Sequence, residues 1–249
     1  AAVSMSLKRL QSYSSIDWRQ RKDNVVSPVK NQGQCGSCWA FSAVEEIESC
    51  NALSSGSLKV LSPQQVVSCE PHHSGCQGGW PDWAYSYAVS SGGLEPARDY
   101  PYTSGDTSQN GACAFNKTDV AVAITGFTSV ADENAMLAQI ATSPISVCVD
   151  ASTWQFYSGG IIRAGACGTS LDHCVQVVGY DATSSPPSWI VRNSWSSDWG
   201  QAGFLLVEAG SDVCGIGQHA TIAEPCSATT KVAAATTEHH LRASFTTKK

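Results

Sequence analysis

The first half of the chain places apolar residues at helical spacing. After the segment QGQCG, Ser37 can cap a helix, because a serine oxygen can accept from the free N–H groups of the first turn. Ser62 and Pro63 suit the cap and the first position of a second helix. The pattern over residues 82–90 predicts a third helix. In the first helix apolar residues recur every third position, at Phe41, Val44 and Ile47.

After about residue 120 the helical spacing gives way to short apolar runs that are typical of strands. A helix predicted over residues 133–141 interrupts them. A helix-rich half followed by a strand-rich half indicates an α+β fold of two domains, with a cleft between them as the usual place for a site. The predicted strands span residues 120–124, 145–149, 174–178 and 189–192.

This pattern predicts four segments. Residues 13–128 form a mainly helical domain and residues 129–224 a mainly β domain. Residues 1–12 lack an initiator Met and the charged-then-apolar layout of a signal peptide, so we expect a flexible extension of a processed chain. Residues 225–249 are rich in Ala, Thr and Lys without periodicity, which predicts a disordered tail.

The composition of the chain argues against some classes of protein and favours others. The chain has 15 Lys and Arg against 21 Asp and Glu, and this mild acidity argues against nucleic acid and anionic membranes as partners. No apolar run approaches the ~20 residues needed to cross a bilayer. Eleven cysteines favour the secretory pathway, and their odd number leaves at least one outside any intramolecular pair. Asn116 begins a glycosylation sequon that supports this compartment only weakly.

Cys35 and Cys38 form a C-x-x-C pair, which can be a redox couple, half of a zinc site, or one structural and one catalytic cysteine. A redox couple needs a βαβ setting that the pattern does not show. A zinc site could also use Cys69 and Cys76 as its second pair of ligands. Six residues separate those two cysteines, which is more than the short spacing usual in such sites. Cys38 lies at the start of a predicted helix, where free N–H groups and the helix dipole lower a thiol pKa and favour the reactive thiolate.

A thiolate nucleophile needs an acid that protonates the leaving amine, and histidine suits that role. Among six histidines, His173 stands alone at the head of a strand, beside Asp172. The pair at residues 72–73 is interpreted as part of a surface loop, and the pair at residues 239–240 as functionless. His173 is therefore the predicted general acid and base.

Four segments in order, QGQCGSCWAF, CQGGWP, LDHCVQVVGY and RNSWSSDWGQAGF, resemble the papain/cathepsin cysteine proteases, of the cathepsin L-like group. The resemblance covers about residues 17–223. His173 and Asn193 follow Cys38 at close to the ~130–150 positions typical of the family. It implies a helical left domain and an antiparallel β-barrel right domain, with the active-site cleft between them.

The resemblance also implies a cysteine endopeptidase that works through an acyl-enzyme. Cys38 would be the nucleophile, His173 the base and acid, and Asn193 the group that orients the imidazole. Gln32, with the backbone N–H of Cys38, would form the oxyanion hole. Trp195 would shield the His–Asn hydrogen bond from water.

Further site residues are implied in the same way. An extended substrate would pair its backbone with Gly78 and Gly79, and the side chain two residues before the scissile bond would enter a pocket with His219 at its floor. A neutral His219 would accept apolar or aromatic side chains, and a protonated one acidic side chains. The pocket walls would be Trp80, Pro81, Cys148, Leu171 and Cys174.

The implied disulfides leave Cys38 free; they are Cys35–Cys76, Cys69–Cys113 and Cys167–Cys214. Cys148 and Cys174 are interpreted as buried free thiols that act as small apolar groups, with a bridge between them as a competing hypothesis. Cys50 could pair with Cys226, or Cys226 with another chain; the sequence leaves this open. Ser196 stands where the family usually has glycine.

The implied partners are polypeptide substrates, inhibitors of the cystatin type and the chain's own propeptide, of which residues 1–12 would be the last stretch. We expect a monomer without cofactor or metal, in a lysosome or related acidic vacuole or secreted. The alternative is a catalytically silent papain-fold protein that binds peptides or acts as a scaffold. Such a protein usually loses the nucleophile or the histidine, whereas Cys38, His173, Asn193 and Gln32 are all present.

Overall fold

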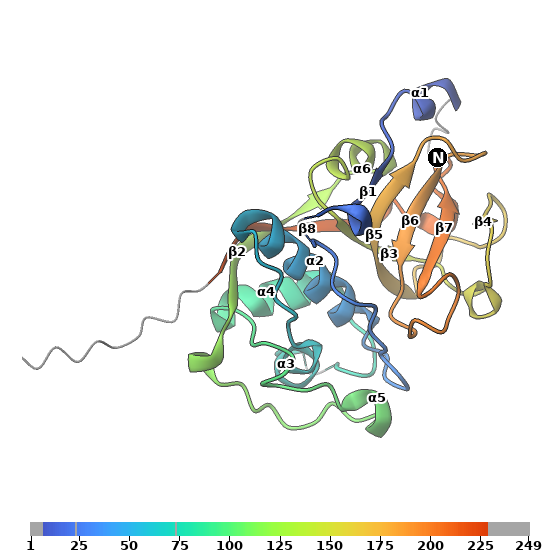
Figure 1. The fold of residues 1–249 in the computed structure, drawn as a ribbon. Helices are drawn as coiled ribbons and strands as arrows, with labels where there is room; N and C mark the ends of the chain where they lie inside the picture. Colours follow the sequence, from blue (N-terminus) through green and yellow to red (C-terminus); the bar gives the residue numbers. More distant parts are fainter. Residues whose placement is uncertain (1–6, 23, 73, 229–249) are drawn as a thin grey trace, which may run out of the picture.

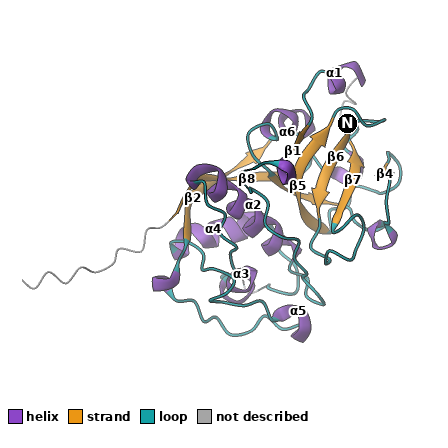
Figure 2. Cartoon of the chain, in the orientation of Figure 1, coloured by secondary structure: helices purple, strands orange, loops and turns teal. Residues whose placement is uncertain are grey.

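The computed structural model describes residues 7–22, 24–72 and 74–228. The helices α2, α3, α4 and α5 lie together on one side of the described chain, and most of the strands lie on the other side with α1 and α6 (Figures 1 and 2). The α-helices are α1 (Leu7–Gln11), α2 (Cys38–Ser55), α3 (Pro63–Cys69), α4 (Pro81–Ser91), α5 (Ser104–Thr107) and α6 (Glu133–Gln139). Short 3-10 helices lie at Trp18–Gln20, Lys117–Asp119, Trp154–Phe156 and Val213–Gly215.

The strands form one sheet in the order β2-β8-β3-β5-β6-β7-β4, and β1 pairs with β5 outside this path. All pairs are antiparallel except β4 with β7. The strands are β1 (Ile16–Asp17), β2 (Val122–Val130), β3 (Ile145–Val149), β4 (Ile161–Ile162), β5 (His173–Asp181), β6 (Ser188–Arg192), β7 (Phe204–Glu208) and β8 (Ala220–Ala228). The α+β class is confirmed. The recorded pairings run as a path from β2 to β4, so closure into a barrel stays a prediction.

The predicted caps have different outcomes. The hydroxyl of Ser62 accepts from the backbone N–H of Gln65 at 3.0 Å, and α3 begins at Pro63 as expected. Ser37 occupies the cap position of α2, but its side chain makes no capping hydrogen bond and instead contacts the hydroxyl of Tyr102 at 2.8 Å. The beginning of α2 is therefore set by tertiary contacts rather than by its own cap.

Both predicted domain ends differ from the structure. Residues 7–11, expected within a flexible extension, form α1, because Leu10 is buried and its carbonyl accepts from the hydroxyl of Tyr180 at 2.8 Å. Strand β8 runs past residue 224 to Ala228, where it pairs with Val122 of β2. Residues 1–6 and 229–249 lie outside the described residues, and the predictions of an extension and a disordered tail there stay predictions.

Two clusters of buried apolar side chains support the two halves. One lies in the sheet and includes Val147, Val175 and Trp189; the other lies among α2, α3 and α4 and includes Trp39 and Tyr85. The clusters do not follow the predicted boundary at residue 128. Trp18 belongs to the sheet cluster, whereas Ala223 packs into the helical one.

Helix α2 is buried on nearly every side, and its contact with the sheet is partly apolar and partly polar. The hydroxyl of Ser42 donates to the carbonyl of Val175 on β5 at 2.6 Å. The amide of Gln176 donates to the carbonyl of Glu45 and to the hydroxyl of Ser49, each at 3.1 Å. These residues follow Cys38 at helical spacing, so one stripe of α2 meets the sheet through hydrogen bonds. We call this contact the polar seam.

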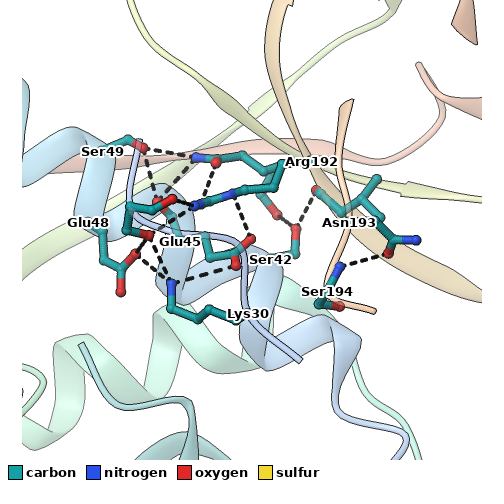
Figure 3. Close-up of polar contacts among 12 residues, drawn as sticks. Lys30, Ser42, Glu45, Glu48, Ser49, Arg192, Asn193 and Ser194 are labelled. Carbon is teal, nitrogen blue, oxygen red and sulfur yellow. Dashed lines mark hydrogen bonds and ion pairs between the residues drawn. The ribbon is translucent and has the colours of Figure 1, made fainter. Parts of the chain in front are cut away.

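Charged side chains continue the polar seam, as Figure 3 shows. Arg192, at the end of β6, is fully buried, lies 3.2 Å from Glu45 and donates to the amide oxygen of Gln176 at 2.6 Å. Lys30 pairs with Glu48 at 2.7 Å. Because removal of one partner would leave another charge buried and unpaired, this network fixes how α2 sits on the sheet. It also fixes the chain next to Asn193.

No helix in the described part of the chain combines the length and the hydrophobicity that a bilayer crossing requires. The longest helix, α2, contains Glu45, Glu46 and Glu48 within its central turns.

Glu46 is a buried carboxyl group that has no ion-pair partner recorded. It accepts from the backbone N–H of Ala223 at 2.8 Å and from the hydroxyl of Tyr85 at 3.3 Å. Burial outweighs these hydrogen bonds and raises its pKa to about 8. In the unfolded chain the carboxyl ionises near its ordinary pKa of ~4.3. Stability from this group is therefore fully present below the unfolded pKa and is lost as pH rises toward 8.

We predict that Glu46→Gln keeps the same acceptor oxygen and removes this loss. Thermal unfolding should show the variant and the parent equally stable near pH 4, and the variant more stable by several degrees near pH 8. Glu224→Gln, a matched change at an exposed position, should leave the pH dependence as it is. A parent protein whose melting temperature follows that of Glu46→Gln at every pH would contradict a neutral Glu46.

Candidate active site

The first residue of a helix and the first residue of a strand, from the two halves of the chain, line the same cleft. Cys38 is the first residue of α2 and His173 the first residue of β5. Both line a cleft of about 640 Å³, together with Gln32 and Trp195. Cys38 is the one free cysteine recorded among the described residues, and it is partly exposed. The predicted position of His173 at a strand head is confirmed.

Cys38 and His173 shift each other's pKa in opposite directions. Burial disfavours the thiolate, but the charge of His173, a hydrogen bond from its ring and the backbone amides of Cys174 and Trp39 outweigh burial and lower the pKa of Cys38. Burial likewise disfavours the imidazolium, but the charge of Cys38 and hydrogen bonds to Cys38 and Asn193 raise the pKa of His173. Each group thus favours the charged form of the other, so the pair favours a thiolate beside an imidazolium more than either group would alone.

Asn193 fixes the imidazole orientation. Its side-chain oxygen lies 2.8 Å from Nε2 of His173 and also accepts from the backbone N–H of Ser194 at 2.8 Å. Since the backbone donor identifies that atom as the oxygen, Nε2 of His173 must carry a proton, which leaves Nδ1 for the sulfur of Cys38. Asn193 is fully buried.

Aromatic rings enclose this hydrogen bond. The ring of Trp195 lies 4.8 Å from that of His173, and Trp154 approaches from another side at 6.2 Å. Trp199 in turn meets Trp195 edge-on at 5.1 Å. A shielded hydrogen bond is stronger than one open to water. The main chain after Trp195 bends at Ser196, whose φ of +74° explains why glycine would suit that position.

Gln32 is held by hydrogen bonds at both ends of its amide. Nε2 donates to the carbonyl of Cys35 at 2.9 Å, and Oε1 accepts from the hydroxyl of Ser194 at 2.7 Å. An amide nitrogen has two protons, so one donor remains on the side that lines the cleft. The N–H of Cys38, in the first turn of α2, has no intrahelical acceptor. Two donors are thus available among the residues that line the cleft.

The structure places most, but not all, of the expected pocket residues on the cleft. Gly79 has no room for a side chain, because an added Cβ would lie 2.7 Å from the ring of Trp39. Pro81 and His219 are not among the lining residues. Those of the prediction that line the cleft are Gly78, Gly79, Trp80, Cys148, Leu171, Cys174 and Trp195.

His219 lies behind Trp80, with the two rings 4.9 Å apart. Its Nε2 is 2.9 Å from a carboxylate oxygen of Asp82. A protonated His219 would therefore already have an anionic partner. This pairing weakens the idea that His219 attracts acidic substrate side chains.

Sequence reasoning missed several lining residues, of which Trp83 is the largest. Trp83 follows Trp80 by three positions on α4, a spacing that puts both rings near one face of the helix and could have signalled a shared role. Its ring stacks on that of His72 at 4.5 Å. His73 lies outside the described residues. The other missed lining residues are Gly36, Ser74, Gln77 and Asp172.

Among pairs whose two side chains are both described, the structure contains the three implied disulfides and one more, and the bonds are Cys35–Cys76, Cys69–Cys113, Cys167–Cys214 and Cys148–Cys174. The interpretation of Cys148 and Cys174 as free thiols is wrong, because these residues face each other across β3 and β5. The bond between Cys35 and Cys76 also excludes Cys35 as a redox or zinc partner of Cys38. Cys50 is disulfide-bonded, and the side chain of Cys226 lies outside the described residues.

Asn116 is exposed at the start of a 3-10 turn, where its side chain donates to Asp119 at 2.7 Å and accepts from Thr118. Its glycosylation stays a prediction. Among the residues from 7 to 228 that are described, no group of three or more His, Cys, Asp or Glu side chains is arranged to hold a metal ion.

The chain is similar to known proteins over most of its length. The family model described as papain family cysteine protease matches residues 13–224. Oryzain beta chain of Oryza sativa subsp. japonica is 42% identical over 218 residues, which cover 83% of this chain and 45% of that protein. Vignain of Ricinus communis is 42% identical over 219 residues, which cover 84% and 59%. The chain spans about half the length of the curated relatives it matches.

A solved structure gives the same result for the fold. The bromelain protease from Ananas comosus, in complex with the E64 inhibitor, superposes with a TM-score of 0.76 at 37% sequence identity. The match covers 84% of this chain and 98% of that chain. Together with the family model, these matches show that the chain belongs to the papain family of cysteine proteases.

Proposed function

We propose that the protein is a cysteine endopeptidase that hydrolyses peptide bonds through Cys38, His173 and Asn193. The observation that carries this proposal is the free sulfur of Cys38, which lines the same cleft as His173, and whose pKa is lowered by that imidazole while the pKa of His173 is raised in turn. Family membership supports the reaction class.

The first half of the reaction forms an acyl-enzyme. The thiolate of Cys38 attacks the peptide carbonyl, and the N–H of Cys38 and the free amide proton of Gln32 stabilise the oxyanion. When the intermediate collapses, protonated His173 gives its proton to the leaving amine, and a thioester to Cys38 remains. Asn193 holds the ring in the tautomer that this transfer needs.

The second half releases the acyl group. Neutral His173 removes a proton from water, and the resulting hydroxide attacks the thioester carbonyl. Collapse of the second oxyanion expels the Cys38 thiolate and yields the carboxylate product. The protonated His173 and the thiolate are thereby restored, so no group is consumed.

The cellular setting follows from the same features. Four disulfides support an oxidising environment, and we propose general protein degradation or processing in a lysosome, a related acidic vacuole or outside the cell. Polypeptides are the proposed substrates. Cystatin-type inhibitors and the chain's own propeptide are the proposed protein partners, because each would have to occupy the cleft that contains Cys38.

The first prediction concerns the nucleophile. E64, which is named with the bromelain structure, should label the protein one-to-one at Cys38 and abolish cleavage of a peptide substrate. Cys38→Ala should lose both labelling and cleavage, because no other free thiol is recorded among the described residues. Intact labelling without turnover would favour the silent scaffold, and cleavage by Cys38→Ala would contradict the mechanism.

The second prediction concerns pH. The kcat/KM should rise as pH increases through the lowered pKa of Cys38 and fall as pH passes the raised pKa of His173. Asn193→Ala removes a hydrogen bond that favours the imidazolium, so the alkaline limb should move to lower pH. Asn116→Ala, the same change at an exposed site, should leave both limbs in place. An unmoved alkaline limb in Asn193→Ala would refute the orienting role.

The third prediction concerns the oxyanion. Gln32→Ala should lower kcat by about 10²–10³ with a much smaller change in KM, since the lost donor acts mainly in the transition state. Gln109→Ala, at an exposed position, provides the control. If Gln32→Ala raised KM and left kcat alone, Gln32 would be a ground-state binding residue instead.

A further inference from the structure

We propose that Tyr102 is a positioning residue that holds the two donors of the oxyanion hole at a fixed separation. Its hydroxyl contacts both the residue that carries one donor, Gln32, and the residue before the other, Ser37. This inference rests on the proposed function, in which the donors are the side-chain amide of Gln32 and the N–H of Cys38. Tyr102 is not among the residues that line the cleft, so it acts through these donors and not on the substrate.

The direction of each hydrogen bond at Tyr102 follows from its partners. The carbonyl of Gln32 can only accept, so the Tyr102 hydroxyl donates its one proton to it, at 2.9 Å. The serine must then be the donor in the contact between Ser37 and Tyr102 at 2.8 Å. Ser37 makes no capping hydrogen bond with α2, and its other acceptor, the carbonyl of Cys35, lies farther away at 3.4 Å.

These two hydrogen bonds span the loop that contains both donors. Ser37 directly precedes Cys38, and two N–H groups of the first turn of α2 donate to the carbonyl of Ser37 at 2.9 and 3.2 Å. A shift of Ser37 therefore moves the turn that carries the N–H of Cys38. At the other end, the side-chain amide of Gln32 is bonded through both its nitrogen and its oxygen. A shift of the Gln32 backbone therefore changes the direction of the donor that faces the cleft.

Tyr102 can set these positions because its own segment is held from outside the site. The side-chain oxygen of Gln64, a buried residue of α3, accepts from the N–H groups of Thr103 and Ser104 at 2.7 and 3.0 Å. The ring of Tyr102 meets that of Phe41 edge-on at 4.8 Å. The hydroxyl thus projects from a backbone and a ring that are both held in place.

Two glycines let the segment of Tyr102 lie directly against the loop of Gln32. The N–H of Gln34 donates to the carbonyl of Gly105 at 2.8 Å. A Cβ added to Gly33 would lie 2.6 Å from the carbonyl oxygen of Gly105, and one added to Gly105 would lie 2.9 Å from the ring of Tyr102. Larger residues at either position would push the two segments apart, so this close approach is what brings the hydroxyl to the carbonyl of Gln32.

The experiment compares kcat and KM of Tyr102→Phe with those of the parent, each kcat being expressed per active site titrated with E64. The change removes one oxygen and keeps the ring. We expect kcat to fall by about three- to ten-fold, the range of one net hydrogen bond, with KM nearly unchanged, because the donors act mainly in the transition state. The titration counts only reactive molecules, so a fraction that fails to fold does not alter the result. An unchanged kcat overturns the inference.

A peptide aldehyde gives a second readout that a merely structural role would not move. Its adduct with Cys38 places an oxygen where the reaction develops the oxyanion, so it resembles the transition state. The inhibition constant should therefore rise in Tyr102→Phe by the factor by which kcat falls. Both limbs of the pH profile should stay in place, because burial raises the pKa of Tyr102 and its hydroxyl keeps its proton. A fall in kcat with unchanged aldehyde affinity would contradict the positioning role.

Tyr100→Phe is the matched control, two positions away in the same segment. The hydroxyl of Tyr100 donates to the carbonyl of Ala112 at 3.1 Å and accepts from the N–H of Ala114 at 3.0 Å. The change removes these hydrogen bonds, neither of which involves Gln32 or Ser37. It should lower the melting temperature and leave kcat and the aldehyde affinity as they are. An equal fall of kcat in both variants would assign the effect to loosening of the segment and overturn the inference.

A double-mutant cycle with Gln32→Ala tests whether Tyr102 acts through that donor. Tyr102→Phe should then lower kcat by a smaller factor in the Gln32→Ala background than in the parent. Full additivity of the two losses overturns the inference and leaves the proposed function intact. If the parent neither reacts with E64 at Cys38 nor cleaves peptides, the proposed function itself fails, and the role of Tyr102 fails with it.

Discussion

The rest of the structure depends on one contact, between the first residue of helix α2 and the first residue of strand β5. Cys38 begins α2 and His173 begins β5, and each residue stabilises the charged form of the other. Neither residue could do so alone, since burial by itself would neutralise both. The relative placement of helix and sheet is therefore the constraint that the remaining contacts have to satisfy.

The polar seam is the part of the fold that satisfies this constraint. An apolar helix–sheet contact would leave α2 free to slide, because apolar packing is not directional. The hydrogen bonds of Ser42 and Gln176, and the ion pair of Arg192 with Glu45, specify one register along the helix axis. The Cys148–Cys174 bridge lies at the end of the same contact, next to the reacting sulfur. Stability of the interface and precision of the site thus come from the same residues.

Much of this arrangement was predictable from the sequence. Helical spacing found α2, α3 and α4, and the strand pattern found β3 residue for residue. The reactive position of Cys38 followed from its place before a helix, and His173 from its place before a strand. Strands β7 and β8 were missed. β7 is an apolar run, Phe204 to Val207, directly after Gly200 and Gly203, so the sequence did carry a signal for it, whereas β8 carries Pro225 and small residues of low strand preference.

Other features could not be read from local patterns. Glu45, Glu46 and Glu48 would normally mark an exposed helix face, yet all three are buried, because Arg192, Lys30 and backbone N–H groups distant in sequence meet them. The bridge between Cys148 and Cys174 depends on which residues of β3 and β5 face each other, and no spacing rule supplies that register. The pairing of His219 with Asp82 likewise joins residues that are distant in sequence, so only the fold reveals it.

The central claim, that Cys38 is a thiolate beside a protonated His173, is tested most directly by following the ultraviolet absorbance of the thiolate as pH is varied. The account predicts that the Cys38 thiolate persists well below the ordinary cysteine pKa of ~8.5, and that in His173→Ala its pKa returns toward or above that value. A parent protein in which the thiolate forms only near or above the ordinary pKa, with no change in His173→Ala, would contradict it.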